Sequence, residues 1–477
     1  MRSVTPPSMV VSGCRSFLVS LSLARTLQIS HSSLNNHNIN YAIKCCSPIN
    51  TLSPALTSDS EPSRSDLASS PTSSSSTGYP RHDRLLPCPS PNSAPRIEHL
   101  VVSEDGPVLE YICKALDFPP SSVAELIRLG AVYYALVSPQ PPSTAPQEQI
   151  RIFREATEPS VLRKRSSIKG MTIQQAQKTY RVTNVDQFVE AGTYLRVYVY
   201  PKRFPRCYEI DWRSRIIAVT ESYVVLDKPA GTSVGGTTNN IEETCAIFTT
   251  RALGLSTPLL TTHQLDNCTG GCVVLARTKE YSSIFHGKIR EKKVKKLYLA
   301  LAAAPLPCGI ITHYMRPVNR APRLISEDYM EGWHLCQLEV MECRKVPWPS
   351  NVIQDKYCIE ECGWPSQDYA YECKINLITG KTHQIRAQFG ASKAPLIGDS
   401  MYMPAAVAEM ANPGLNPFGK HKTEFSCESE KEMAILNWIA QHGKEPSVAI
   451  GLQACEISWD DDGEHFYKAG SPWCSCL

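Results

Sequence analysis

The sequence THQLDNCTGG (residues 262–271) leads directly into the apolar run CVVLA (residues 272–276). Because the residues after the two glycines lack helical periodicity, the pattern predicts a turn that enters a buried strand. Asp266 then lies where a flexible turn meets a rigid strand, a place that fixes a side chain and leaves it accessible for catalysis. The alternative is an Asp that only closes the turn by accepting hydrogen bonds from amides near Thr269.

Length and composition indicate a globular chain with more than one domain. The 477 residues suffice for two or three domains of ordinary size, and 42% of them are hydrophobic. The formal net charge of +3 does not by itself indicate a nucleic-acid binder, so any basic surface must be local. The 19 cysteines are scattered, and no Cys/His pair has zinc-finger spacing. We therefore expect reduced, packed thiols and no metal site.

Residues 1–98 are excluded from the predicted fold. They are rich in Ser, Pro, Thr and Asn and contain no acidic residue before Asp59. This composition is typical of an organelle transit peptide followed by a disordered linker. The apolar stretch 9–23 is interrupted by Arg15 and several serines, which argues against a membrane span. We expect a chloroplast protein, with the mitochondrion as the alternative, because the presequence is long, Ser-rich and modest in Arg.

The segment that follows has the pattern of a small α+β module. Its apolar spacing predicts helices at residues 108–116 and 123–129 and strands at residues 131–134 and 192–199. Gly130 directly follows the second helix, where a C-terminal glycine is expected.

Residues 99–204 resemble the RNA-binding domain named after a ribosomal small-subunit protein, with an insertion at residues 136–188. In that domain the second helix presents basic side chains to RNA, so the resemblance implies an RNA contact for Arg128. The alternative interpretation is a structural remnant that does not bind RNA.

Two further segments contribute basic residues. Lys228 ends a predicted buried strand, and the segment 285–296 carries six Lys or Arg residues before a predicted strand that contains Tyr298. Lysines such as Lys292 and Lys293 form either a surface that follows phosphates or an ordinary solvated face. Taken alone, Tyr298 would be a core tyrosine.

The segment 376–389 predicts a strand, a glycine turn and a helix that begins with Thr382 as its N-cap. Lys381, His383 and Arg386 concentrate positive charge at this helix start, where backbone amides also favour anions.

These motifs occur in an order that resembles RluA-type RNA pseudouridine synthases. They are KPAG (228–231), HQLDNCTGG (263–271), KLYLA (296–300), GKTHQIR (380–386), PLIGD (395–399) and LQA (452–454). The resemblance implies an α+β pseudouridine synthase fold, with a central mixed, mainly antiparallel sheet and flanking helices. The catalytic domain would span residues 205–477, with insertions at 339–372 and 404–447. Amphipathic spacing predicts a helix at 428–441 within the second insertion.

Carried over residue by residue, the resemblance makes Asp266 the catalytic carboxylate, Tyr298 the stacking residue and general base, and Arg386 the partner of Asp266. An arginine close to an Asp orients the carboxylate and favours its charged form. The family usually has Arg two residues before the catalytic Asp, where it helps to reorganise RNA around a flipped base. Gln264 stands there in this chain and keeps hydrogen bonding without the charge.

RNA contacts are further expected from Lys292 and Lys293, and from Lys228, Lys381 and His383, which would contact phosphate or support the scaffold of the site. The implied activity is the isomerisation of uridine to pseudouridine in structured RNA (rRNA or tRNA), by a monomer without metal, cofactor or membrane association. The carboxylate either attacks the sugar or removes its C2′ proton.

Two alternatives remain at this point. One is a non-catalytic RNA-binding protein that retains the synthase fold. The other is a glycoside hydrolase, which normally uses two acids near the scissile bond. Asp266 has no obvious acidic partner among the motifs.

Overall fold

The structure, a computed structural model, describes Leu86 and residues 96–472 with several gaps. The gaps are residues 144, 164, 318–320, 412–426, 428, 431–432, 435–436, 438–440, 442 and 462. The predicted transit segment 1–98 and the helix predicted at 428–441 therefore lie largely outside the described residues.

The N-terminal module is a four-stranded antiparallel sheet with two helices. The sheet order is β1 (Ile97–Val101), β6 (Tyr194–Tyr198), β3 (Val132–Ala135) and β4 (Tyr180–Arg181), and the helices are α1 (Val108–Leu116) and α2 (Pro120–Leu129). Strands β2 (Gly106–Pro107) and β5 (Phe188–Val189) form a separate pair. The predicted helices are confirmed, and Gly130 ends α2 in the left-handed conformation. The two helices and the sheet share one apolar core, to which Ile112, Leu126 and Leu195 contribute.

The range 136–188 contains mostly short helices. They are α3 (Gln147–Ala156), α4 (Pro159–Leu162), the 3₁₀ turn η2 (Ser166–Ile168) and α5 (Ile173–Ala176). Strand β4 also falls in this range, yet it pairs with β3 and completes the small sheet.

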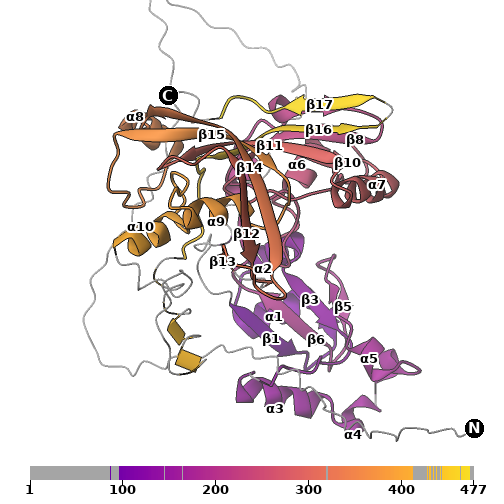
Figure 1. Ribbon diagram of the computed structural model, residues 1–477. Helices are drawn as coiled ribbons and strands as arrows, with labels where there is room; N and C mark the ends of the chain where they lie inside the picture. Colours follow the sequence, from indigo (N-terminus) through magenta and orange to yellow (C-terminus); the bar gives the residue numbers. More distant parts are fainter. Residues whose placement is uncertain are drawn as a thin grey trace, which may run out of the picture. The chain divides into compact units, whose positions relative to one another are not determined.

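The C-terminal region is built on an eleven-stranded sheet, in which β10, β16, β11, β15 and β14 lie side by side (Figure 1). In sheet order the strands are β13 (Ile325–Ser326), β12 (Gly309–Met315), β14 (His334–Pro347), β15 (Tyr369–Leu377), β11 (Val294–Ala302), β16 (Leu452–Asp460), β10 (Gly270–Ala276), β8 (Tyr223–Lys228) and β7 (Ile216–Val219), with β17 (Glu464–Lys468) beside β16 and β9 (Leu260–Thr261) beside β10. Among the described strands only β10 and β16 pair in parallel. The predicted mixed, mainly antiparallel sheet is confirmed.

The helices of this region are α6 (Cys245–Ala252), α7 (Lys279–Arg290), α8 (Asn351–Tyr357), α9 (Gln384–Ala391) and α10 (Met403–Ala411), with 3₁₀ turns η3 (Pro205–Tyr208) and η4 (Arg213–Arg215). None of the helices in the described part of the chain is long and apolar enough to cross a membrane.

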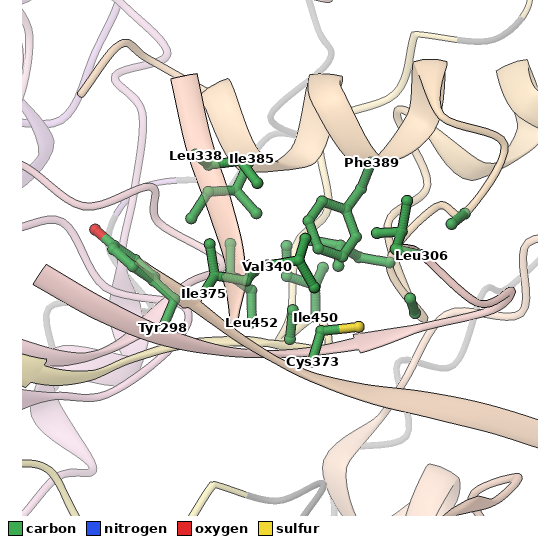
Figure 2. Packing of buried hydrophobic residues seen from close by; sticks show 14 of the residues in the cluster. Tyr298, Leu306, Leu338, Val340, Cys373, Ile375, Ile385, Phe389, Ile450 and Leu452 are labelled. Atoms are coloured by element: carbon green, nitrogen blue, oxygen red, sulfur yellow. The ribbon is translucent and has the colours of Figure 1, made fainter. Parts of the chain in front are cut away.

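Helix α9 is buried on all sides, from Gln384 to Gly390. Figure 2 shows Ile385 and Phe389 pointing from α9 into the apolar cluster on the sheet. Its polar side is also satisfied, because Gln384 donates to the carbonyl of Gln337 and Gln388 donates to the carbonyl of Ile311. The side-chain amides of both glutamines thus have hydrogen-bond partners, as buried polar groups require.

The predicted start of α9 is wrong by one residue. His383, not Thr382, is the N-cap, and it adopts a left-handed conformation with φ of 57°. The reason is a side-chain turn, in which Gln384 Oε1 accepts hydrogen bonds from the Lys381 amide (3.1 Å) and the Thr379 hydroxyl (3.0 Å). Because residues 379–383 form this turn, α9 begins only at Gln384.

The predicted insertion at 339–372 forms the outer half of the β14–β15 hairpin together with α8. Register pairs such as Cys343↔Cys373 continue the pairing of the two strands as far as Pro347↔Tyr369. Behind the hairpin, Trp348 and Trp364 pack against an apolar cluster that contains Ile397. The segment is therefore an integral part of the sheet edge, and its status as an insertion stays a prediction.

The parallel contact of β10 with β16 predicts a strong effect for Gly271→Ala. Gly271 has φ of +113°, and an added Cβ would overlap the backbone carbonyl of Ala454. In Gly271→Ala, the backbone strain at positive φ and the overlap with Ala454 should together lower the free energy of unfolding by about 2–5 kcal/mol. Urea titration measures this change. Gly287→Ala in α7 is the control, since nothing lies within 4 Å of its added Cβ. It should stabilise the protein by about 0.5–1 kcal/mol. Equal effects of the two changes would contradict this account.

Candidate active site

Asp266 lies in the loop between β9 and β10. Its backbone carbonyl accepts a hydrogen bond from the Thr269 amide at 3.0 Å, which closes the turn before Gly270. The carboxylate instead lies near Arg386 and His383, and its side chain is 19% exposed. The alternative of an Asp side chain that only caps the turn therefore does not describe the structure.

Lys228 supports this turn from the protein interior. Its side chain is 1% exposed, and Nζ donates to the carbonyls of Thr269 (2.7 Å), Asn267 (3.2 Å) and Pro229 (3.2 Å). Burial lowers the pKa of Lys228. These contacts fit the scaffold role expected for Lys228 rather than a phosphate contact, because its ammonium group already satisfies buried carbonyls.

Arg386 is fully buried at the centre of the site. Nε and Nη2 donate to the two oxygens of Asp399 at 2.8 and 3.0 Å, a bidentate arrangement that fixes the guanidinium plane. The remaining Nη1 lies 3.4 Å from Asp266 Oδ2, so the predicted pairing of these two residues is present in the structure. Asp399 also accepts the amide of Met401, which anchors this carboxylate.

Glu445 is a second carboxylate at the same place. Its Oε1 lies 3.5 Å from Arg386 Nη1, and its side chain is 16% exposed. Sequence reasoning assigned no role to Glu445 or to Asp399. Asp399 could have been found, since it stands in one of the quoted motifs, whereas Glu445 follows a long stretch without a motif.

His383 belongs to this cluster and not to a phosphate-binding surface. Its Nε2 lies 3.9 Å from both Asp266 Oδ1 and Glu445 Oε2, and its Nδ1 lies 3.2 Å from the Tyr402 hydroxyl. Burial, and then the charge of Arg386, lower the pKa of His383. The lowered pKa favours the neutral imidazole, which fits the scaffold role expected for His383.

Tyr298 lies at the margin of the apolar cluster on β11, with its hydroxyl pointing away from the other labelled residues (Figure 2). The side chain is 6% exposed. Burial, and then the negative charge of Asp266, raise the pKa of Tyr298. The phenol thus stays protonated at neutral pH, which argues against the predicted role as general base, whereas the ring remains suited to stacking. Both roles stay predictions.

Four of the predicted RNA contacts are exposed and able to meet a ligand. They are Gln264, Lys292, Lys293 and Lys381. Gln264 stands two residues before Asp266, and Lys381 two residues before His383. Lys292 and Lys293 follow the end of α7, where Lys293 pairs with Glu291 at 2.7 Å while remaining 64% exposed. The structure does not bring these two lysines into contact with the carboxylate cluster.

Arg128 is neutralised within the protein. It pairs with Glu125 at 2.6 Å and Glu242 at 3.5 Å, and it donates to the Tyr208 hydroxyl. The predicted RNA contact of Arg128 is therefore not supported, because its charge already has two carboxylate partners.

In the described ranges, no group of three or more His, Cys, Asp or Glu residues has the arrangement of a metal site. The Asp266–Glu445–His383 cluster is instead organised around a guanidinium. An ionic group of this kind orients carboxylates for reaction with an organic substrate.

Comparison with known proteins identifies the family. The family model described as RNA pseudouridylate synthase matches residues 222–391. RNA pseudouridine synthase 6, chloroplastic, of Arabidopsis thaliana is 67% identical over 405 residues, which cover 84% of this chain and 86% of that protein. The rice protein of the same name (Oryza sativa subsp. japonica) is 64% identical over 396 residues, 83% of each chain.

A more distant relative is bacterial. Ribosomal large subunit pseudouridine synthase C of Haemophilus ducreyi is 30% identical over 223 residues, 46% of this chain and 63% of that protein. Both plant relatives are named chloroplastic, which agrees with the predicted chloroplast location rather than with the mitochondrial alternative. The chain belongs to the family of RNA pseudouridine synthases, isomerases that convert uridine in RNA to pseudouridine.

Proposed function

We propose that Asp266 is the catalytic carboxylate of this synthase, that Arg386 orients it, and that Tyr298 stacks on the target base. One observation carries the proposal: the backbone carbonyl of Asp266 closes the turn, which leaves the partly exposed carboxylate 3.4 Å from a buried guanidinium. A carboxylate held by its own loop and by an arginine is preorganised for reaction.

The isomerisation breaks the bond between N1 of the base and C1′ of ribose, and forms a bond between C5 and the same C1′. The Asp266 carboxylate either attacks C1′ or removes the C2′ proton, and both routes require it to face the sugar. The uridine must leave its stack to reach this position. Tyr298 then offers its ring to the flipped base and a protonated hydroxyl as a hydrogen-bond donor.

The proposed substrate is structured RNA, either rRNA or tRNA. The bacterial relative named for the large ribosomal subunit supports rRNA. Gln264, Lys292, Lys293 and Lys381 are the proposed RNA contacts, because their side chains are exposed. The proposed organisation is a transit peptide and linker at 1–98, an RNA-binding domain at 99–204 and a catalytic domain at 205–477, acting as a monomer.

Asp266→Asn tests the catalytic role directly. The amide cannot act as a nucleophile or a base, so we expect tritium release from RNA labelled at uridine C5 to fall by about 10³-fold or more. RNA affinity should stay as in the wild type, and the protein should remain folded, because Asp399 keeps its two hydrogen bonds to Arg386. Asp355→Asn, at an exposed position of α8, is the matched control and should retain full activity. Undiminished release by Asp266→Asn would remove Asp266 from the mechanism.

The exposed lysines are tested by the salt dependence of RNA binding. We expect the combined change of Lys292, Lys293 and Lys381 to Gln to weaken RNA binding, because phosphate contacts are lost. Each lost contact should make the slope of log affinity against log salt shallower by about 0.7–0.9. Lys279→Gln is the control, since Lys279 is exposed at the opposite end of α7. An unchanged slope in the triple variant would show that these lysines lie off the RNA path.

A further inference from the structure

Glu445 has the same two partners as the proposed catalytic carboxylate. Its oxygens lie 3.5 Å from Arg386 Nη1 and 3.9 Å from His383 Nε2, and the corresponding distances for Asp266 are 3.4 and 3.9 Å. The two carboxylates therefore share one edge of a guanidinium and one nitrogen of an imidazole. A third carboxylate, Asp399, is fully buried on the opposite side of Arg386 and cannot meet a substrate.

Glu445 is also held in place. Just beyond it, the amide and hydroxyl of Ser447 donate to Glu360 Oε1 at 3.2 and 3.0 Å. Just before it, the carbonyl of Lys444 accepts a hydrogen bond from the Ser400 hydroxyl. Glu445 is 16% exposed, close to the 19% of Asp266, so both carboxylates reach solvent from the same cluster.

The reaction needs a proton acceptor that the roles assigned so far do not supply. When C5 has bonded to C1′, it still carries its hydrogen, and that proton must leave to restore the base. Asp266 is engaged at the sugar in either route. The raised pKa of Tyr298 keeps its phenol protonated at neutral pH, and a neutral phenol is a weak proton acceptor. The cluster offers two other acceptors, Glu445 and the neutral imidazole of His383. Glu445 is the more exposed of the two, at 16% of its side chain against 9%, and burial lowers the pKa of His383, which weakens it as a base.

We propose that Glu445 is the general base that removes the C5 proton in the last step of the isomerisation, an inference that rests on the proposed role of Asp266. The C5–H bond breaks and its electron pair forms the C5=C6 double bond. The former C6=N1 pair moves to N1, which takes a proton from water. The C5 proton passes to the Glu445 carboxylate, and from there to solvent. His383 and Arg386 keep the two carboxylates side by side.

A kinetic isotope effect tests this role. The full chain is assayed under single-turnover conditions on in vitro transcripts of chloroplast rRNA made with protium or deuterium at uridine C5. We expect Glu445→Gln to slow product formation by about 10²–10⁴-fold. The ratio of the protium rate to the deuterium rate should exceed that of the wild type, because C5–H cleavage has become the slow step. Glu361→Gln, an exposed control, should behave as the wild type.

Two results would overturn the proposal: full activity of Glu445→Gln, or a slowed reaction with an unchanged isotope ratio, as expected of a residue that only positions Asp266. If Glu445→Gln does not fold, Glu445→Asp serves instead, and a slowed but isotope-insensitive reaction overturns the proposal. Asp266→Asn is run in the same assay. An active Asp266→Asn counts against the proposed function, whereas an inactive Asp266→Asn beside a fully active Glu445→Gln counts against Glu445 alone.

Discussion

The fully buried guanidinium of Arg386 is the group on which the site depends. It forms two hydrogen bonds with Asp399 and lies within 3.5 Å of both Asp266 and Glu445. A guanidinium that is shielded from solvent requires such partners. Removing one partner of a buried ion pair typically lowers the free energy of unfolding by about 3–5 kcal/mol. Arg386 in turn has its position because α9 is surrounded by protein, with Ile385 in the apolar cluster on the sheet.

Four segments from three separate regions of the sequence meet at this arginine. The β9–β10 loop brings Asp266, α9 brings Arg386, the turn after α9 brings Asp399, and the segment before β16 brings Glu445. The parallel contact of β10 with β16 joins the first and last of these, since Gly271 lies opposite Ala454. Lys228 holds the Asp266 turn through the carbonyls of Asn267 and Thr269. The sheet thus fixes the carboxylates while leaving their oxygens partly open to solvent.

Much of this arrangement is predictable from sequence. The ordered motifs indicate the fold, because each carries its own turn or strand pattern, and their resemblance to RluA-type synthases implies the pairing of Asp266 with Arg386. Other features depend on contacts that no local pattern encodes. A lysine at a strand end looks the same whether it faces water or, like Lys228, buried carbonyls. The charge of Arg128 is neutralised by Glu125 one turn earlier in the same helix, a pair that helical spacing allows, and also by Glu242 from a distant loop. Glu445 reaches the site only through the tertiary fold.

The most direct measurement is the crystal structure of Asp266→Asn bound to the RNA fragment that the wild-type enzyme modifies. In that crystal structure we expect a uridine flipped out of its stack, with its base against the Tyr298 ring. The ribose C1′ or C2′ should lie within about 3.5 Å of the residue 266 side chain, the distance of a near-attack arrangement. A target uridine whose ribose lies away from residue 266 and Arg386 would contradict the central claim that this arginine-held carboxylate performs the isomerisation.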